Sequence, residues 1–169
     1  MTTITEGALA FDFPAQWVAS KYDAWKFYLN QFQSVCGSAK AVDIIAIHVN
    51  QRLWLIEIKD YRAEPRQKAI ELAEEVALKV RDTLAGLMAA QVQANDDDEK
   101  QIAKRSVRCG DLKIVLHLEQ PSKPSRLHPV EDFSKLIQKL KQLLRAIDPH
   151  PRVTNLADGN RFGWDVREV

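Results

Sequence analysis

The 169-residue chain is poor in the residue types that mark special classes of protein. It has two cysteines, Cys36 and Cys109, whose positions match no metal-site spacing, so we expect two free thiols rather than a zinc centre or a disulfide framework. No apolar run approaches the roughly 20 residues of a membrane-spanning helix, and the N-terminus lacks the basic and then apolar regions of a signal peptide. We therefore expect a cytoplasmic protein with no membrane partner.

Glycine is also scarce, and the six glycines are scattered, which excludes a phosphate-binding glycine loop and a nucleophilic serine elbow. Neither sign of charge is in excess, because 24 Lys and Arg residues balance 23 Asp and Glu residues to a net charge of +1. Any attraction to nucleic acid must then come from local clusters of basic side chains. Hydrophobic residues make up 46% of the chain, and the length fits one globular domain over residues 1–169.

The stretch 41–61, AVDIIAIHVNQRLWLIEIKDY, is the most informative part of the chain. Two apolar, β-branched runs are separated by a short polar break, which predicts a β-hairpin. The first run carries Asp43, and the second ends with Glu57 and Lys59 on either side of Ile58. Ionised groups in strands as apolar as these are costly unless something pairs with them. These side chains are therefore the first candidates for a functional site.

The register of the hairpin decides whether these side chains meet. Glu57 and Lys59 are two residues apart, so they share one face of their strand. A two-residue turn would place Asp43 opposite Ile58, whereas a three-residue loop places it opposite Glu57 or Lys59. We expect the odd loop, or a bulge, because the two carboxylates then come close enough to share one hard cation. With an even turn, the chain is a plain α/β protein with an unrelated ligand, and without a metal the three charges are a salt-bridged patch.

Apolar spacing predicts the other elements. In chain order they are a weak edge strand at 9–13, a helix at 15–33 after Pro14, a long helix that starts at Pro65, a strand at 111–119, a helix at 133–147 and a possible strand at 152–157. The polar stretch 93–110 contains the acidic run 96–99 and is expected to be a solvated loop. Alternation of helices and strands is typical of the α/β class.

Asp43, thirteen intervening residues and then Glu57-Ile58-Lys59, placed between two predicted helices, resemble the motif of the PD-(D/E)xK nuclease superfamily. The resemblance implies a restriction endonuclease-like α-β-β-β-α-β core with a central mixed sheet flanked by helices. It implies Lys59, Asp43 and Glu57 as catalytic residues. It also implies a metal site formed by Asp43 and Glu57, to which the preceding helix adds an acid, Asp23 first and Glu6 or Asp12 as alternatives. Magnesium coordination adds the Ile58 carbonyl as a further expected ligand.

The function that this resemblance implies is a nuclease that hydrolyses nucleic acid, DNA in the first instance, with water activated by Mg²⁺ or Mn²⁺. The alternative is a catalytically inactive module of the same fold that binds nucleic acid or a partner protein. A homodimer is conceivable, since a nuclease with one site needs two copies to cut both strands of a duplex. Basic residues in two groups are candidates for phosphate contacts, with a solvated surface as the alternative. They are Lys104, Arg105, Arg108, Lys135, Lys139 and Arg145.

Overall fold

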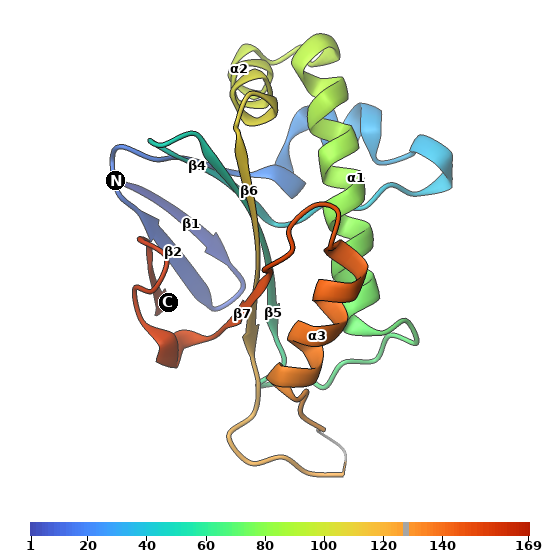
Figure 1. Ribbon diagram of the computed structural model, residues 1–169, viewed down its shortest axis with the longest axis vertical. Helices are drawn as coiled ribbons and strands as arrows, with labels where there is room; N and C mark the ends of the chain where they lie inside the picture. Colours follow the sequence, from blue (N-terminus) through green and yellow to red (C-terminus); the bar gives the residue numbers. More distant parts are fainter. Residues whose placement is uncertain (127–128) are drawn as a thin grey trace.

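The computed structural model describes residues 1–126 and 129–169 and contains two β-sheets (Figure 1). The larger is a five-stranded mixed sheet in the order β3-β4-β5-β6-β7, and the smaller is a three-stranded antiparallel sheet in the order β1-β2-β8. The strands are β1 (Thr2–Glu6), β2 (Leu9–Phe13), β3 (Val18–Lys21), β4 (Ile44–His48), β5 (Arg52–Asp60), β6 (Asp111–Glu119), β7 (Arg152–Thr154) and β8 (Asp165–Glu168). The predicted mixed α/β class is confirmed.

Three layers build the molecule. Helices α1 (Leu72–Gln93) and α3 (Phe133–Leu144) cover one face of the large sheet, and the small sheet covers the other (Figure 1). The predicted mixed sheet is therefore flanked by helices on one face only. Within residues 1–126 and 129–169, each helix is either too short or too polar to span a lipid bilayer. The single domain over 1–169 stays a prediction.

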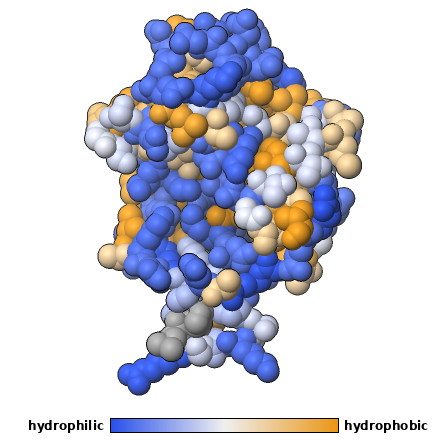
Figure 2. Space-filling view, turned by 180° about the vertical axis from the view of Figure 1, so that it is seen from behind, coloured by the Kyte–Doolittle hydropathy of each residue, from blue (hydrophilic) through white to orange (hydrophobic). Residues whose placement is uncertain are grey.

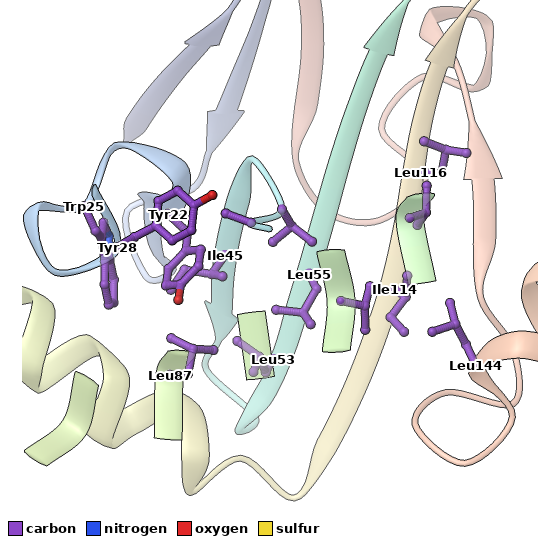
Figure 3. Packing of buried hydrophobic residues seen from close by; sticks show 14 of the residues in the cluster. Tyr22, Trp25, Tyr28, Ile45, Leu53, Leu55, Leu87, Ile114, Leu116 and Leu144 are labelled. Carbon is purple, nitrogen blue, oxygen red and sulfur yellow. The ribbon is translucent and has the colours of Figure 1, made fainter. Parts of the chain in front are cut away.

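Alternation along the strands sends side chains into two separate hydrophobic clusters. On β5, Leu53 and Leu55 belong to the helix-side cluster, which also contains Leu87 of α1 and Leu144 of α3 (Figure 3). Trp54 and Ile56 belong to the cluster under the small sheet. Odd-numbered residues of β5 therefore lie on the helix side, which is also the side of Glu57 and Lys59.

The predicted hairpin is confirmed as β4 and β5. Its last pair is His48 with Arg52, so the loop holds the three residues 49–51. Gln51 has a φ of 60°, the left-handed conformation that ends a three-residue hairpin loop. β5 then pairs in parallel with β6, and α1 and α2 lie in the long crossover that a parallel pair requires.

The predicted helix over 15–33 is wrong. Its first part is β3, which pairs antiparallel with β4, and the rest forms a 3-10 turn (Tyr22–Ala24) and a π-helical segment (Tyr28–Phe32). Pairing with β4 satisfies the backbone groups that a helix would have satisfied locally. The aromatic residues of the expected stripe are nevertheless core residues, as predicted, because Tyr22 and Trp25 are buried in the helix-side cluster.

The predicted solvated loop over 93–110 is also wrong, because residues 97–107 form α2 (Asp97–Val107). The Asp96 side chain caps this helix by accepting hydrogen bonds from the backbone N–H groups of Asp98 and Glu99. Acids in its first turn and bases in its last turn complement the helix dipole. The acidic run is thus a helix start.

The structure also tests four smaller expectations. The strand at 9–13 is confirmed, but as the central strand of the small sheet rather than an edge. The long helix begins at Leu72 and not at Pro65, because residues 61–71 form an irregular segment that approaches the site described below. Both cysteines are free thiols, as predicted. The strand expected at 152–157 is confirmed in shorter form as β7.

Glu99 links α2 to residues 26 and 27, in the segment where a helix was predicted. Its carboxylate accepts hydrogen bonds from the backbone N–H of Lys26, at 2.7 Å, and of Phe27, at 3.0 Å. We expect Glu99→Ala to lower the free energy of unfolding by about 2–3 kcal/mol, because two hydrogen bonds to a charged acceptor are lost. Urea denaturation measures the change. Asp98→Ala, an exposed change in the same turn, is the control, and equal losses in both variants would contradict this role of Glu99.

Candidate functional site

Asp43 lies directly before β4, and α1 holds the backbone that leads to it. The N–H of Lys40 donates to the Asp82 carboxylate, and the N–H of Val42 donates to the Thr83 hydroxyl at 3.0 Å. Asp43 itself accepts a 2.6 Å hydrogen bond from the backbone N–H of Ile58 on β5. The helix and the neighbouring strand thus fix the position of the carboxylate, which is 7% exposed.

Glu57 is fully buried and meets two lysines. Its Oε1 lies 2.6 Å from the Nζ of Lys59 on β5 and 2.6 Å from the Nζ of Lys79 on α1. The Lys79 ammonium also lies 3.6 Å from Asp43 Oδ1. The Lys79 ammonium therefore lies between the carboxylates of Asp43 and Glu57. The motif found in the sequence did not include this lysine.

Burial controls the protonation of this group of side chains. It raises the pKa of Glu57 to about 7, with a further contribution from Asp43, while Lys79 and Lys59 act in the opposite direction. Burial and the nearby Asp43 also raise the pKa of Asp23 to about 6. Burial would lower the pKa of Lys59, but the Glu57 carboxylate outweighs it and the pKa is raised. Near neutral pH, Glu57 is thus divided between its charged and neutral forms.

A third carboxylate, that of Glu75 on α1, extends the network toward the surface. Its carboxylate oxygens lie 3.4 Å from Lys59 Nζ, 2.5 Å from Lys68 Nζ and 2.7 Å from a guanidinium nitrogen of Arg66. Burial acts to raise the pKa of Glu75, but these cations outweigh it and lower the pKa to about 2. We call Asp43, Glu57, Lys59, Glu75 and Lys79 the acid–lysine cluster.

A cavity of about 360 Å³ opens beside the acid–lysine cluster. Three cations line it, namely Lys59, Arg66 and Lys68. Its two acids are Glu64 and Asp60, and Asp60 is paired with Arg62. Hydrophilic side chains cover much of the molecular surface in Figure 2.

The structure brings Asp43, Glu57 and Lys59 together, because the three-residue loop sets the register that the site requires. Asp23, the third expected acid, lies close enough for Asp43 to raise its pKa. The catalytic and metal-binding roles of these residues, and the role of the Ile58 carbonyl, stay predictions. Among the residues that the structure describes, no group of three His, Cys, Asp or Glu side chains is arranged to hold a metal ion.

The predicted basic residues do not form one rim around this site. The C-terminal end of α2 carries Lys104, Arg105 and Arg108. It lies at the end of the sheet where the parallel strands β5 and β6 begin, whereas Lys59 lies near the other end of β5. Lys139 of α3 is nearer, but it is paired with Glu71 at 3.1 Å. Lys135 lines the same surface hollow as Lys139, and Arg145 is exposed at the far end of α3.

Sequence reasoning missed Glu75, Lys79, Arg66 and Lys68. A signal for Lys79 exists, because residues 72, 76, 79, 83, 86 and 90 of α1 repeat at spacings of four and three. All of them are buried except Lys79, which is partly buried. A lysine on an otherwise buried stripe predicts a buried acid opposite it. No comparable pattern marks Arg66 and Lys68, which lie in an irregular segment.

Comparison with known proteins finds similarity to a cysteine–tRNA ligase of Neisseria meningitidis serogroup A / serotype 4A, with 38% identity over 170 residues. The match covers 82% of this chain and 24% of the ligase, so the chain spans about a quarter of the length of this relative. No family model matches the sequence, and no solved structure matches it.

This similarity contradicts the predicted membership in the PD-(D/E)xK nuclease superfamily. The relative that matches 82% of this chain is named as a tRNA ligase. The predicted nuclease, hydrolase and endonuclease assignments are therefore wrong. The motif misled for a physical reason. Buried acids such as Asp43 and Glu57 require cations beside them whatever the protein does, and Lys59 and Lys79 fill that requirement here.

Proposed function

We propose that this chain is an RNA-binding domain that holds a backbone phosphate in the cavity beside the acid–lysine cluster. The observation that carries the proposal is the approach of Lys59, Arg66 and Lys68 to one side of this cavity, from β5 and from the segment before α1. Arginine and lysine are the usual phosphate-binding side chains, arginine through its planar fork and lysine as a point charge.

The charge balance of the site supports an anionic ligand. Four cations, Lys59, Arg66, Lys68 and Lys79, share the three carboxylates of Asp43, Glu57 and Glu75. The pKa of Glu57 is about 7, so this group carries less than its full negative charge near neutral pH. The acid–lysine cluster together with Arg66 and Lys68 therefore carries a positive charge, which Glu64, the acid on the cavity wall that Arg62 does not pair, offsets in part.

RNA is the favoured nucleic acid because the relative is named for a reaction with tRNA. The chain matches a quarter of that ligase, so we propose a binding module rather than the whole ligase activity. DNA, the partner first expected from the sequence, becomes the comparison in the test.

Magnesium binding is a separate part of the proposal. Carboxylate oxygens are the ligands that Mg²⁺ prefers. Within the described residues, Glu57 Oε2 and Asp23 Oδ1 are buried oxygens without a hydrogen-bond partner. With Asp43 and the Ile58 carbonyl they are the ligands expected from the sequence, and these acids would have to move closer together to hold one ion, because no three described acids are arranged around a common point. Lys79 already neutralises Asp43 and Glu57, so Mg²⁺ would compete with its ammonium. Calorimetric titration with MgCl₂ of the native protein and of Asp43→Asn tests this part.

Fluorescence anisotropy with labelled tRNA tests RNA binding. We expect Lys68→Glu to weaken binding about tenfold and to reduce the slope of log affinity against log salt by about one, because a phosphate contact is lost. Lys68 suits the test because its side chain is 58% exposed, so its replacement spares the core. Lys141→Glu, an exposed change on α3, is the matched control and should have little effect.

Two results would refute the proposal. One is the absence of tRNA binding at low salt, and the other is an equal loss of affinity in Lys68→Glu and Lys141→Glu. A duplex DNA that binds more tightly than tRNA would overturn the choice of RNA.

A further inference from the structure

A second cavity, of about 350 Å³, lies at the opposite end of β5 and on the opposite face of the large sheet. Its lining comes from β5, β6, the start of β7 and the segment before β8. The residues are Arg52, Trp54, Lys113, His150, Arg152, Arg161 and Phe162, which we call the aromatic–arginine pocket. Trp54 and Lys59 are five positions apart on β5, roughly 16 Å along the strand, so this pocket is distinct from the acid–lysine cluster.

The sheet register explains why these side chains share one face. Arg52 pairs with Asp111, Trp54 pairs with Lys113, and Arg152 of β7 pairs with Val115. Side chains two apart on a strand, and those directly opposite on a neighbouring strand, point the same way. Three adjacent strands therefore present cations and an indole side by side.

The pocket has more positive than negative charge. Arg52 and Lys113 share one carboxylate, that of Asp111, at 2.5 and 3.0 Å. Arg161 lies 4.0 Å from Asp158, and among the described residues no ion pair is recorded for Arg152, which is exposed. The four cations thus have two carboxylate partners, which leaves an excess of positive charge for an anionic ligand.

The pocket also has aromatic surface. The rings of Trp54 and Phe162 lie 5.5 Å apart, and the guanidinium carbons of Arg52 and Arg161 each lie 5.8 Å from the centre of one of these rings. Trp54 is 7% exposed, and within the described part of the chain its indole N–H has no hydrogen-bond acceptor. A buried donor without a partner is costly, so a ligand that supplies an acceptor gains binding energy there.

We propose that the aromatic–arginine pocket binds one nucleotide, with the base stacked against Phe162 and the phosphate held by Arg152 and Arg161. Aromatic rings accept any base by stacking, and arginines bind phosphate through their planar fork. The volume lies at the lower end of the roughly 300–1,000 Å³ of small-molecule sites. The nucleotide is either free or part of an RNA strand, and the site does not depend on phosphate binding beside the acid–lysine cluster.

Tryptophan fluorescence and calorimetry with AMP, adenosine, inorganic phosphate and the ribonucleotide tetramer rA₄ test this proposal. AMP should bind at least about tenfold more tightly than adenosine or phosphate alone, because it engages both the rings and the cations. Tighter binding of rA₄ than of AMP identifies the strand as the source, and the reverse identifies the free nucleotide. Absence of binding by both AMP and rA₄ overturns the proposal.

Variants locate the binding. Arg152→Gln should weaken AMP about tenfold, since a charged hydrogen bond is lost, and Phe162→Leu should weaken AMP more than phosphate. Arg81→Gln, an exposed change on α1, is the matched control and should bind AMP normally. An equal effect of Arg152→Gln and Arg81→Gln would overturn the assignment. Lys68→Glu should leave AMP binding unchanged, so the two proposed sites fail or succeed separately.

Discussion

Replacement of Lys79 by methionine is expected to lower the free energy of unfolding by about 3–5 kcal/mol, the usual cost of breaking a buried ion pair. The Lys79 ammonium lies 2.6 Å from Glu57 and 3.6 Å from Asp43, and both acids are nearly or fully buried. Without it, Lys59 alone neutralises two adjacent carboxylates. Methionine replaces the apolar stem of the lysine and removes the ammonium, so the loss reports mainly on charge. Urea denaturation at pH 7 measures the difference.

Arg81→Met is the control for this prediction, because Arg81 lies on the same helix with a side chain that is 66% exposed. Its loss should cost no more than about 1 kcal/mol, as for other surface ion pairs. Glu57→Gln combined with Lys79→Met should recover part of the stability, since one of the stranded charges is gone. If Lys79→Met costs no more than Arg81→Met, Lys79 is not the counter-ion of the buried acids.

The stability of the native protein is expected to fall as the pH rises from about 4.5 to about 7, because of Glu57. Burial raises its folded-state pKa from 4.5 to about 7, so the folded state holds this proton more tightly than the unfolded state does. Loss of the proton therefore favours unfolding. The slope is at most about 1.4 kcal/mol per pH unit for one group. Glu57→Gln should remove it, and urea denaturation over a pH series measures it.

Two other acids determine the pH range in which the effect of Glu57 on stability can be measured separately. Asp23, with a pKa raised from 3.8 to about 6, adds a slope of the same sign below pH 6. Glu75, with a pKa lowered from 4.5 to about 2, acts oppositely, and its contribution is lost as the pH falls below about 4.5. Between pH 6 and 7 the slope should persist in Asp23→Asn and vanish in Glu57→Gln. Equal slopes in both variants would contradict the assignment to Glu57.

The hairpin shows how far local patterns carry a prediction. Two β-branched runs around a polar break predicted β4 and β5, and the register argument predicted that an odd loop would bring Asp43 to Glu57. Strand β6 and the start of α3 also follow their predicted limits. In each case the apolar period matches the element and no distant partner competes with it.

The segment 15–33 shows where local patterns fail. Its apolar residues repeat at helical spacing, yet the open edge of β4 and the carboxylate of Glu99 satisfy its backbone groups better than a helix does. Both partners are distant in the sequence, so no local pattern contains them. The order of elements expected for a nuclease fold depended on this helix, and the inferred activity depended on a short motif.

The sequence by itself determined the mixed α/β class, the hairpin and the face that Glu57 and Lys59 share, because strand alternation is a local property. The structure decided that the loop has three residues, which brings Asp43 to the same face. The tertiary structure decided which cations form ion pairs with the buried acids. Lys79 comes from a helix that packs across the sheet, and the Arg66 and Lys68 side chains come from an irregular segment before that helix. Long-range packing also built the aromatic–arginine pocket, because the sheet register aligns β5, β6 and β7 and the segment before β8 then packs against them.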